Sequence, residues 1–341
     1  MAENKEYEEI MQEITSGLTG DKQKDFKYLK EQIEHYSDHK YGKEIGRACG
    51  RLMAKLIPEE ALEEINNAMN NHDLGIETTL EEVQFNQYKK NFDKAVELIE
   101  PLIKKIEEID FFKDDAVSEY HCFDNYFEEI LYQYYNKPEK DLRHATMPLA
   151  TVYTQYGSVL IDVGRWDDAR SALKKALHWN PASADVMFEY SETFKHSGEL
   201  DEYFKIVLDT FKYCYIAKDL ARAYRNLGWY FIEKEQYEDA IVAYFMSVQY
   251  DDDPHVQSEL YYITQKTGKE AKQPTLEEVK KCAETYGFPI GPHKDVAGIA
   301  FSLGKQAFDE NQKDAAKFFL GIFNNLIEDE DVKKMLETLG E

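Results

Sequence analysis

Apolar side chains recur at spacings of three and four residues along most of the chain. In the N-terminal part they form one face in each of three segments, residues 7–14, 26–36 and 45–56. This period is typical of amphipathic helices. Glycine and proline, which end helices, are sparse, at 17 and 9 of 341 residues. The pattern therefore predicts an all-α chain.

The pentapeptide TLEEV occurs twice and marks two further helix starts. Thr79 and Thr275 each stand three residues before a glutamate. At this spacing the threonine hydroxyl accepts the backbone N–H of the glutamate, and the glutamate carboxylate accepts the backbone N–H of the threonine. We therefore expect a capping box, and a helix that begins directly afterwards, at both sites.

A longer period covers the central part of the chain. With Gly157 counted as position 8 of a 34-residue unit, Ser191 and Gly228 take the same position in the next two units. The second interval is three residues longer than the first, so we place an extension around YCYIAK, residues 213–218. Small residues at positions 8 and 20 let two antiparallel helices approach closely, and large residues at 4, 11, 17 and 24 fill the space between them. The spacing predicts stacked helix-turn-helix pairs.

This spacing resembles the tetratricopeptide repeat. Tyr203 departs from the pattern, because a small residue is expected at its position 20. The resemblance implies a right-handed α-solenoid over residues 76–341. Residues 1–75 do not fit the repeat and are expected to form a separate N-terminal helical bundle or cap. The clearest units span residues 150–183, 184–220, 221–254 and 297–330.

Acidic residues dominate the charge of the chain. The 66 acidic and 41 basic residues leave a net charge of −25, which repels phosphate backbones and anionic membrane surfaces. No run approaches the ~20 apolar residues that span a bilayer, and the start MAENKEYEEI lacks the basic and apolar regions of a signal peptide. We therefore expect a cytoplasmic protein that binds neither nucleic acid nor membranes.

Motifs that carry chemistry are weak. His35 and His39 share a helix face but have no evident third ligand, so we expect no metal site. The stretch GIAFSLGKQ mimics a phosphate loop, yet it has one residue too many between its glycines and lacks the final Ser or Thr. No nucleophile signature such as GxSxG occurs. We expect a noncatalytic protein without cofactors.

In tetratricopeptide arrays the first helices of successive pairs line a concave groove, so the resemblance names candidate binding residues. The third unit places two arginines, an asparagine and a tryptophan together in a chain otherwise rich in acid. Arginine can hold a carboxylate through two parallel hydrogen bonds, and tryptophan supplies a flat apolar anchor. The candidates are Thr154, Ser158, Phe188, Glu189, Glu192, Arg222, Arg225, Asn226 and Trp229.

An alternative of equal weight is that Arg222 and Arg225 form ion pairs with Glu189 and Glu192 of the preceding helix. The family also has a carboxylate clamp for C-terminal peptide acids, built from basic and asparagine residues. This chain departs from that clamp, since Thr154 stands where a lysine is expected and Glu189 where an asparagine is expected.

The aromatic segment of residues 119–140 has two interpretations. Its rings lie at helical spacing, which favours burial against the first full repeat. Displayed on the surface, the same rings form the best hydrophobic docking surface of the chain.

These features favour a bacterial-type interaction module, a scaffold that holds an extended or helical peptide segment in its concave groove. The alternative is a peptide-responsive regulator. An acidic helical bundle ahead of a tetratricopeptide array is similar in layout to peptide-sensing response regulators and aspartyl-phosphate phosphatases, in which a bound peptide closes the superhelix and changes what the bundle binds.

Overall fold

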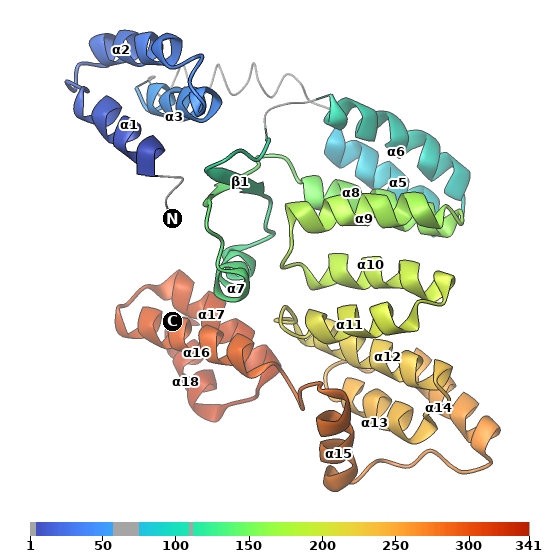
Figure 1. The fold of residues 1–341 in the computed structure, drawn as a ribbon. Coiled ribbons are helices and arrows are strands. Elements are labelled where there is room, and N and C mark those ends of the chain that lie inside the picture. The colour runs from blue at the N-terminus through green and yellow to red at the C-terminus, as the bar shows by residue number, and fades with distance from the viewer. Residues whose placement is uncertain (1–4, 57–74, 109–111, 341) are drawn as a thin grey trace. The chain divides into compact units, whose positions relative to one another are not determined.

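The computed structural model describes residues 5–56, 75–108 and 112–340. Seventeen α-helices and two four-residue strands lie in these ranges, so the fold is all-α, as predicted (Figure 1). The chain forms two compact units: unit 1 is Met1–His121 with Pro138–Met147, and unit 2 is Cys122–Lys137 with Pro148–Glu341. The boundary expected between residues 75 and 76 stays a prediction.

Unit 1 begins with three amphipathic helices that share one apolar core. Ile14, Leu29 and Ile45 are buried at its centre, together with Cys49. Arg47 donates a hydrogen bond to Asp115 at 2.7 Å and so ties the third helix to a segment that follows in the same unit. The helices of unit 1 are α1 (Lys5–Ser16), α2 (Lys22–His35), α3 (Gly42–Ala54), α5 (Ile76–Tyr88) and α6 (Phe92–Glu107).

Unit 1 also holds a small parallel sheet that the sequence analysis did not predict. Strands β1 (Ser118–His121) and β2 (Asp141–His144) pair in register from Ser118 opposite Asp141 to His121 opposite His144. Parallel strands require a crossover connection, and here it contains helix α7 (Tyr126–Asn136). The helical interpretation of residues 119–140 is therefore right for α7 and wrong for residues 119–121. Although β1 and β2 belong to unit 1, α7 belongs to unit 2.

Unit 2 is a TPR-like solenoid of antiparallel helix pairs. The helices of the pairs α8–α9, α10–α11, α12–α13 and α16–α17 pack on each other, whereas α14 and α15 both pack on α13. Helix α10 also contacts the flanking first helices α8 and α12. The last helix packs its apolar side on the final pair, as expected of a cap. The helices are α8 (Leu149–Asp162), α9 (Trp166–Trp179), α10 (Ala184–Ser197), α11 (Leu200–Thr210), α12 (Ala217–Glu233), α13 (Tyr237–Ser247), α14 (Pro254–Thr267), α15 (Leu276–Tyr286), α16 (Lys294–Asp309), α17 (Lys313–Leu326) and α18 (Glu330–Gly340).

Glycine at position 8 lies against the large residue at position 24 in three helix pairs. A Cβ atom added to these glycines would come closer to the facing side chain than real Cβ atoms do. The predicted close approach of the paired helices is confirmed. The pairs, with the distance from that Cβ position to the nearest side-chain atom, are Gly157 with Leu173 (2.4 Å), Gly228 with Tyr244 (2.7 Å) and Gly304 with Leu320 (2.7 Å).

Two departures from the repeat have structural consequences. Tyr203 is completely buried, and its hydroxyl donates a hydrogen bond to the backbone carbonyl of Asn226 on α12, so the large side chain fills space between two repeats. The predicted extension appears as the connection between α11, which ends at Thr210, and α12, which begins at Ala217.

The first capping-box prediction is wrong. Helix α15 begins after Thr275 with both hydrogen bonds of the capping box. Helix α5 instead begins at Ile76, with Gly75 as its N-cap residue in the left-handed region, φ 60°. Thr79 lies inside that helix, because the glycine supplies a conformation that starts it earlier.

Candidate functional site

The predicted binding residues lie on three first helices, α8, α10 and α12, of which each is next to the following one. Helix α12 buries a face that includes Leu220, Tyr224 and Leu227. Because apolar residues fill that face at helical spacing, Arg222 and Trp229 are left on a partly exposed side of the helix.

Arg222 forms ion pairs with α10. Its guanidinium donates to Glu189 at 2.7 Å and to Asp185 at 3.1 Å. It also covers the ring of Phe188, with 4.8 Å to the ring centroid. Phe188 is completely buried, so it does not face a partner as expected. Its ring instead packs against the guanidinium of Arg222. Burial raises the pKa of the Glu189 carboxyl, and the neighbouring Arg222 opposes that shift.

Arg225 points to a different set of acids. Its side chain is 16% exposed and lies 3.1 Å from Asp251 and 3.5 Å from Asp253, in the connection between α13 and α14. Glu192 pairs instead with Lys195 on its own helix, at 2.7 Å. The alternative of internal ion pairs is therefore right for Arg222 with Glu189 and wrong for Glu192. Arg225 lies one turn along α12 from Arg222, and its contacts are with the connection that follows α13.

Trp229 lies beside a lysine and a second aromatic ring. The ammonium of Lys195 is 4.5 Å from the indole centroid, and the ring of Tyr203 meets the indole edge to face at 5.0 Å. Cation–π contacts of this kind hold the indole in one orientation. Trp229 remains partly exposed, which makes it an accessible flat surface among charged neighbours.

Asn226 has an unsatisfied side chain. The residue is 7% exposed, and its side-chain Nδ2 is buried without a hydrogen-bond partner. Within the part of the chain that the structure describes, only one other buried side-chain nitrogen or oxygen atom, Arg143 Nε, shares this condition. A buried donor without an acceptor costs about 1–3 kcal/mol. Asn226 is therefore the energetically unusual member of the predicted set.

Thr154 and Ser158 lie on α8, one helix further from α12. The Thr154 hydroxyl donates a hydrogen bond to the carbonyl of Ala150 in its own helix at 2.7 Å. Both residues are partly exposed. Among the predicted residues, the structure thus brings Arg222 of α12 into direct contact with Phe188 and Glu189 of α10.

The sequence analysis missed the acids and the lysine that complete this set. Lys195 follows Glu192 by three residues, a spacing at which helical side chains meet, so sequence alone contained that signal. Asp251 follows α13, and its contact with Arg225 depends on how two repeats stack. Nothing in the local sequence indicates that contact.

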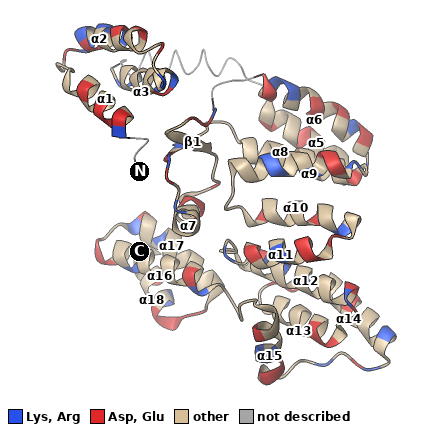
Figure 2. Ribbon diagram, in the orientation of Figure 1, with Lys and Arg blue, Asp and Glu red and all other residues tan. Residues whose placement is uncertain are grey.

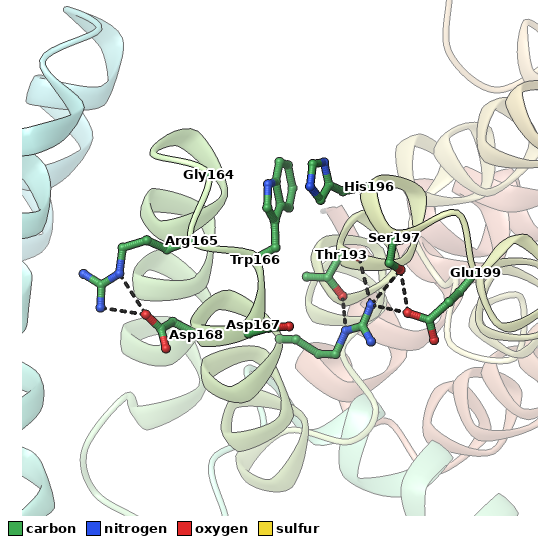
Figure 3. Close-up of a pocket in the computed structure, with 10 residues that line it drawn as sticks. Gly164, Arg165, Trp166, Asp167, Asp168, Thr193, His196, Ser197 and Glu199 are labelled. Carbon is green, nitrogen blue, oxygen red and sulfur yellow. Dashed lines mark hydrogen bonds and ion pairs between the residues drawn. The ribbon is translucent and has the colours of Figure 1, made fainter.

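A cleft lies between the turns of two consecutive helix pairs (Figure 3). This cleft has a volume of about 480 Å³, and Trp166 and His196 stack in it with ring centroids 4.1 Å apart. Both arginines that line it are paired with acids, because Arg170 donates to Glu199 at 2.9 Å and Arg165 to Asp168 at 2.8 Å. Paired charges of this kind favour a structural junction between repeats.

Among the residues that the structure describes, no group of three or more histidine, cysteine, aspartate or glutamate side chains is arranged to hold a metal ion. His39 lies 3.5 Å from Glu6. Within the same described ranges, no helix combines the length and the apolar character needed to cross a membrane.

No family model and no curated protein sequence matches the chain. Among solved structures, it is similar to the crystal structure of the APC/C hetero-tetramer Cut9-Hcn1, with 14% sequence identity and a TM-score of 0.33. The match covers 82% of this chain and 52% of that one, so the chain spans about half the length of the matched protein.

Proposed function

We propose that the protein is a noncatalytic protein-protein interaction scaffold, which binds a peptide or protein segment along the face formed by α8, α10 and α12. The observation that carries the proposal is the buried Nδ2 of Asn226, which has no acceptor. A backbone carbonyl of a bound segment is an acceptor that every peptide provides, and the Asn226 side chain must turn toward the exposed face of α12 to donate to it, because Nδ2 is closed off from solvent in the unbound protein. Binding then recovers the ~1–3 kcal/mol that the unpaired donor costs.

Trp229 supplies the apolar part of the proposed contact. It lies one turn along α12 from Asn226 and is partly exposed. Indole rings in such positions are enriched among the residues that dominate binding energy at protein interfaces. Asn226 would fix the backbone of the segment and Trp229 would pack against one of its side chains.

The ion pairs change the chemistry expected of the partner. Arg222 and Arg225 already neutralise acids of this chain, at 2.7 to 3.5 Å. A carboxylate of the partner would have to displace those acids. We therefore propose recognition through the peptide backbone and an apolar side chain, and not through capture of a carboxylate.

Replacing Asn226 with leucine tests this proposal. Asn226→Leu removes the unpaired donor at similar volume, so we expect unfolding stability to stay the same or rise by up to ~2 kcal/mol. In the same variant, the amount of partner captured from an extract of the source cells should fall at least about tenfold, a loss of ~1.4 kcal/mol in binding.

Ser247→Ala is the matched control, since Ser247 is buried and its hydroxyl donates to the Tyr244 carbonyl within its own helix. This variant should retain capture. Equal capture by Asn226→Leu and the wild type contradicts the proposed role of the amide.

A regulatory role is the second proposal, and one observation favours it. The chain leaves unit 1 after His121, contributes α7 to unit 2, and returns to unit 1 at Pro138. A change in unit 2 that moves α7 therefore pulls directly on the chain of unit 1. In this version a segment bound to the array alters what the N-terminal helices bind, as in phosphatase-like or response-regulator-binding proteins.

A further inference from the structure

Helix α7 packs against parts of unit 2 that are far apart in sequence (Figure 1). Phe127 is completely buried, with its ring 5.5 Å from Tyr215 and 6.0 Å from Phe319. Tyr215 belongs to the connection between α11 and α12, and Phe319 to α17. One side chain of α7 thus joins the middle of the array to its last pair.

The other end of α7 makes a second set of long-range contacts. The Tyr213 hydroxyl donates a hydrogen bond to Asn136 Oδ1 at 3.0 Å. The Tyr135 hydroxyl lies 3.0 Å from Nδ1 of His293, directly before α16. Tyr213 and Tyr215 both lie in the three-residue extension of the repeat, so the insertion that breaks the period provides the seat of α7.

A buried carboxyl group holds the first turn of α7 in place. Glu128 is 3% exposed and accepts hydrogen bonds from Asn180 Nδ2 at 2.7 Å, the Asp124 backbone N–H at 2.8 Å and the Tyr215 hydroxyl at 3.0 Å. These donors come from the segment directly before α7, from the connection between α9 and α10, and from the connection between α11 and α12. All three are uncharged, so a carboxylate here has hydrogen bonds but no counter-ion among them.

We propose that α7 is an internal strap, which closes unit 2 by seating on its connections through Glu128 and which loosens when the Glu128 carboxyl ionises. The side chains that donate to Glu128 are uncharged and its neighbour Asp124 is a second acid, so the neutral carboxylic acid fits the seat better than the carboxylate. Loosening leaves the helix pairs intact and frees the chain between β1 and β2.

The pKa of Glu128 lies near neutral pH, so its carboxyl gains or loses a proton in the physiological range. Burial raises it from 4.5 to about 7, the charge of Asp124 acts in the same direction, and the hydrogen bonds from Asn180 and Tyr215 oppose the shift. A carboxyl with a raised pKa binds its proton more tightly in the seated state. The seat therefore has its full stability below about pH 4.5 and loses it as pH rises through about 7.

The other titratable groups at the seat limit the pH range in which the effect of Glu128 can be measured by itself. The pKa of Asp124 is also raised, by burial and by Asp185, and it reinforces the effect of Glu128 at lower pH. Burial raises the pKa of Cys122 to about 11 and that of Tyr215 far above the physiological range. The pKa of His293 is lowered by burial, so its contribution is lost as pH falls and has the opposite sign. Above about pH 6, Glu128 dominates.

Hydrogen exchange of α7 amides, measured by mass spectrometry on the full chain, tests the strap. After correction for the intrinsic exchange rate, protection of residues 126–136 should fall about tenfold between about pH 6 and about pH 8, given the shift from 4.5 to about 7. Glu128→Gln replaces the acid with a neutral group of the same shape, and should keep α7 protected at both pH values. Glu129→Gln is the matched control on the next residue and should behave as the wild type.

Three outcomes overturn the proposal. They are an unchanged protection of α7 across this pH range in the wild type, the same pH dependence in Glu128→Gln, and an equal loss of protection throughout α8–α13, which would show global unfolding. If Glu128→Gln does not fold, Tyr215→Phe decides. It removes a donor that favours the carboxylate, so the midpoint must move to higher pH, and an unmoved midpoint contradicts the strap.

Discussion

Gly157 lies directly against Leu173, so that a Cβ atom on residue 157 would fall 2.4 Å from Leu173 Cγ. The same relation recurs in two other pairs, at Gly228 and Gly304. In these three pairs the two helices therefore approach through a glycine on the first helix. The pair at Gly228 includes α12, the helix that carries Asn226 and Trp229.

Gly157→Ala should destabilise unit 2 by ~1–3 kcal/mol, since the added methyl group forces Leu173 or the backbone to move. Alanine otherwise favours a helix over glycine by about 1 kcal/mol. Gly298→Ala is the control, because nothing lies within 4 Å of a Cβ there, and it should be stabilising by up to ~1 kcal/mol. Denaturant unfolding measures both, and a neutral Gly157→Ala contradicts the close contact.

Arg222→Met should cost ~1–3 kcal/mol, because it leaves the partly buried Glu189 without its counter-ion. Adding Glu189→Gln should recover part of that loss. Arg165→Met serves as the comparison, since Arg165 and Asp168 are 42% and 57% exposed, and its cost should stay below ~1 kcal/mol. Thermal unfolding of the three variants separates the cases, and equal losses for Arg222→Met and Arg165→Met argue against the ion pair on α12.

Stability should fall as pH rises from about 5 to about 8. Burial raises the pKa of Asp219 from 3.8 to about 6, with Asp185 adding to the shift, and it raises that of Glu128 to about 7. Both groups hold their protons more tightly in the folded state, so their contributions are lost as pH rises through those values. Asp219→Asn should flatten the profile of melting temperature between about pH 4 and 6. An unchanged profile there would show that Asp219 ionises normally.

Thr275→Ala should cost ~1 kcal/mol by removing the N-cap of α15. Thr79→Ala, in the same pentapeptide, should cost clearly less, because Thr79 lies inside α5 and caps nothing. Helix content and denaturant unfolding check both variants. Equal effects would mean that α5 begins at Thr79 after all.

Local spacing was enough to predict the helix pairs, their turns and the glycine contacts, because each repeat folds on residues close in sequence. The errors concern longer-range effects. Gly75 moved the start of α5, β1 found a partner about 20 residues away across α7, and Arg225 found Asp251 in the next connection. The buried donor of Asn226 depends on what surrounds it in three dimensions, so sequence named the residue but not its unpaired state.

Unit 2 also carries many acidic side chains, which is unfavourable for binding a carboxylate of a partner. Acidic residues outnumber basic ones along the chain, and Figure 2 shows them on helices throughout unit 2. The guanidinium groups of Arg222 and Arg225, which the sequence predicts to bind a partner, already form ion pairs within the chain. Their partners are Asp185, Glu189 and Asp251. This is why the proposed recognition rests on Asn226 and Trp229.

Photo-crosslinking from position 229 tests the central claim most directly. A benzophenone amino acid in place of Trp229 keeps an aromatic ring at the proposed contact, and the same group in place of Tyr88, which is 87% exposed on α5, controls for exposure alone. We predict a discrete adduct from position 229 in an extract of the source cells, lost when Asn226→Leu is added, and none from position 88. Adducts from position 88 alone, or an adduct at 229 that survives Asn226→Leu, would contradict the account.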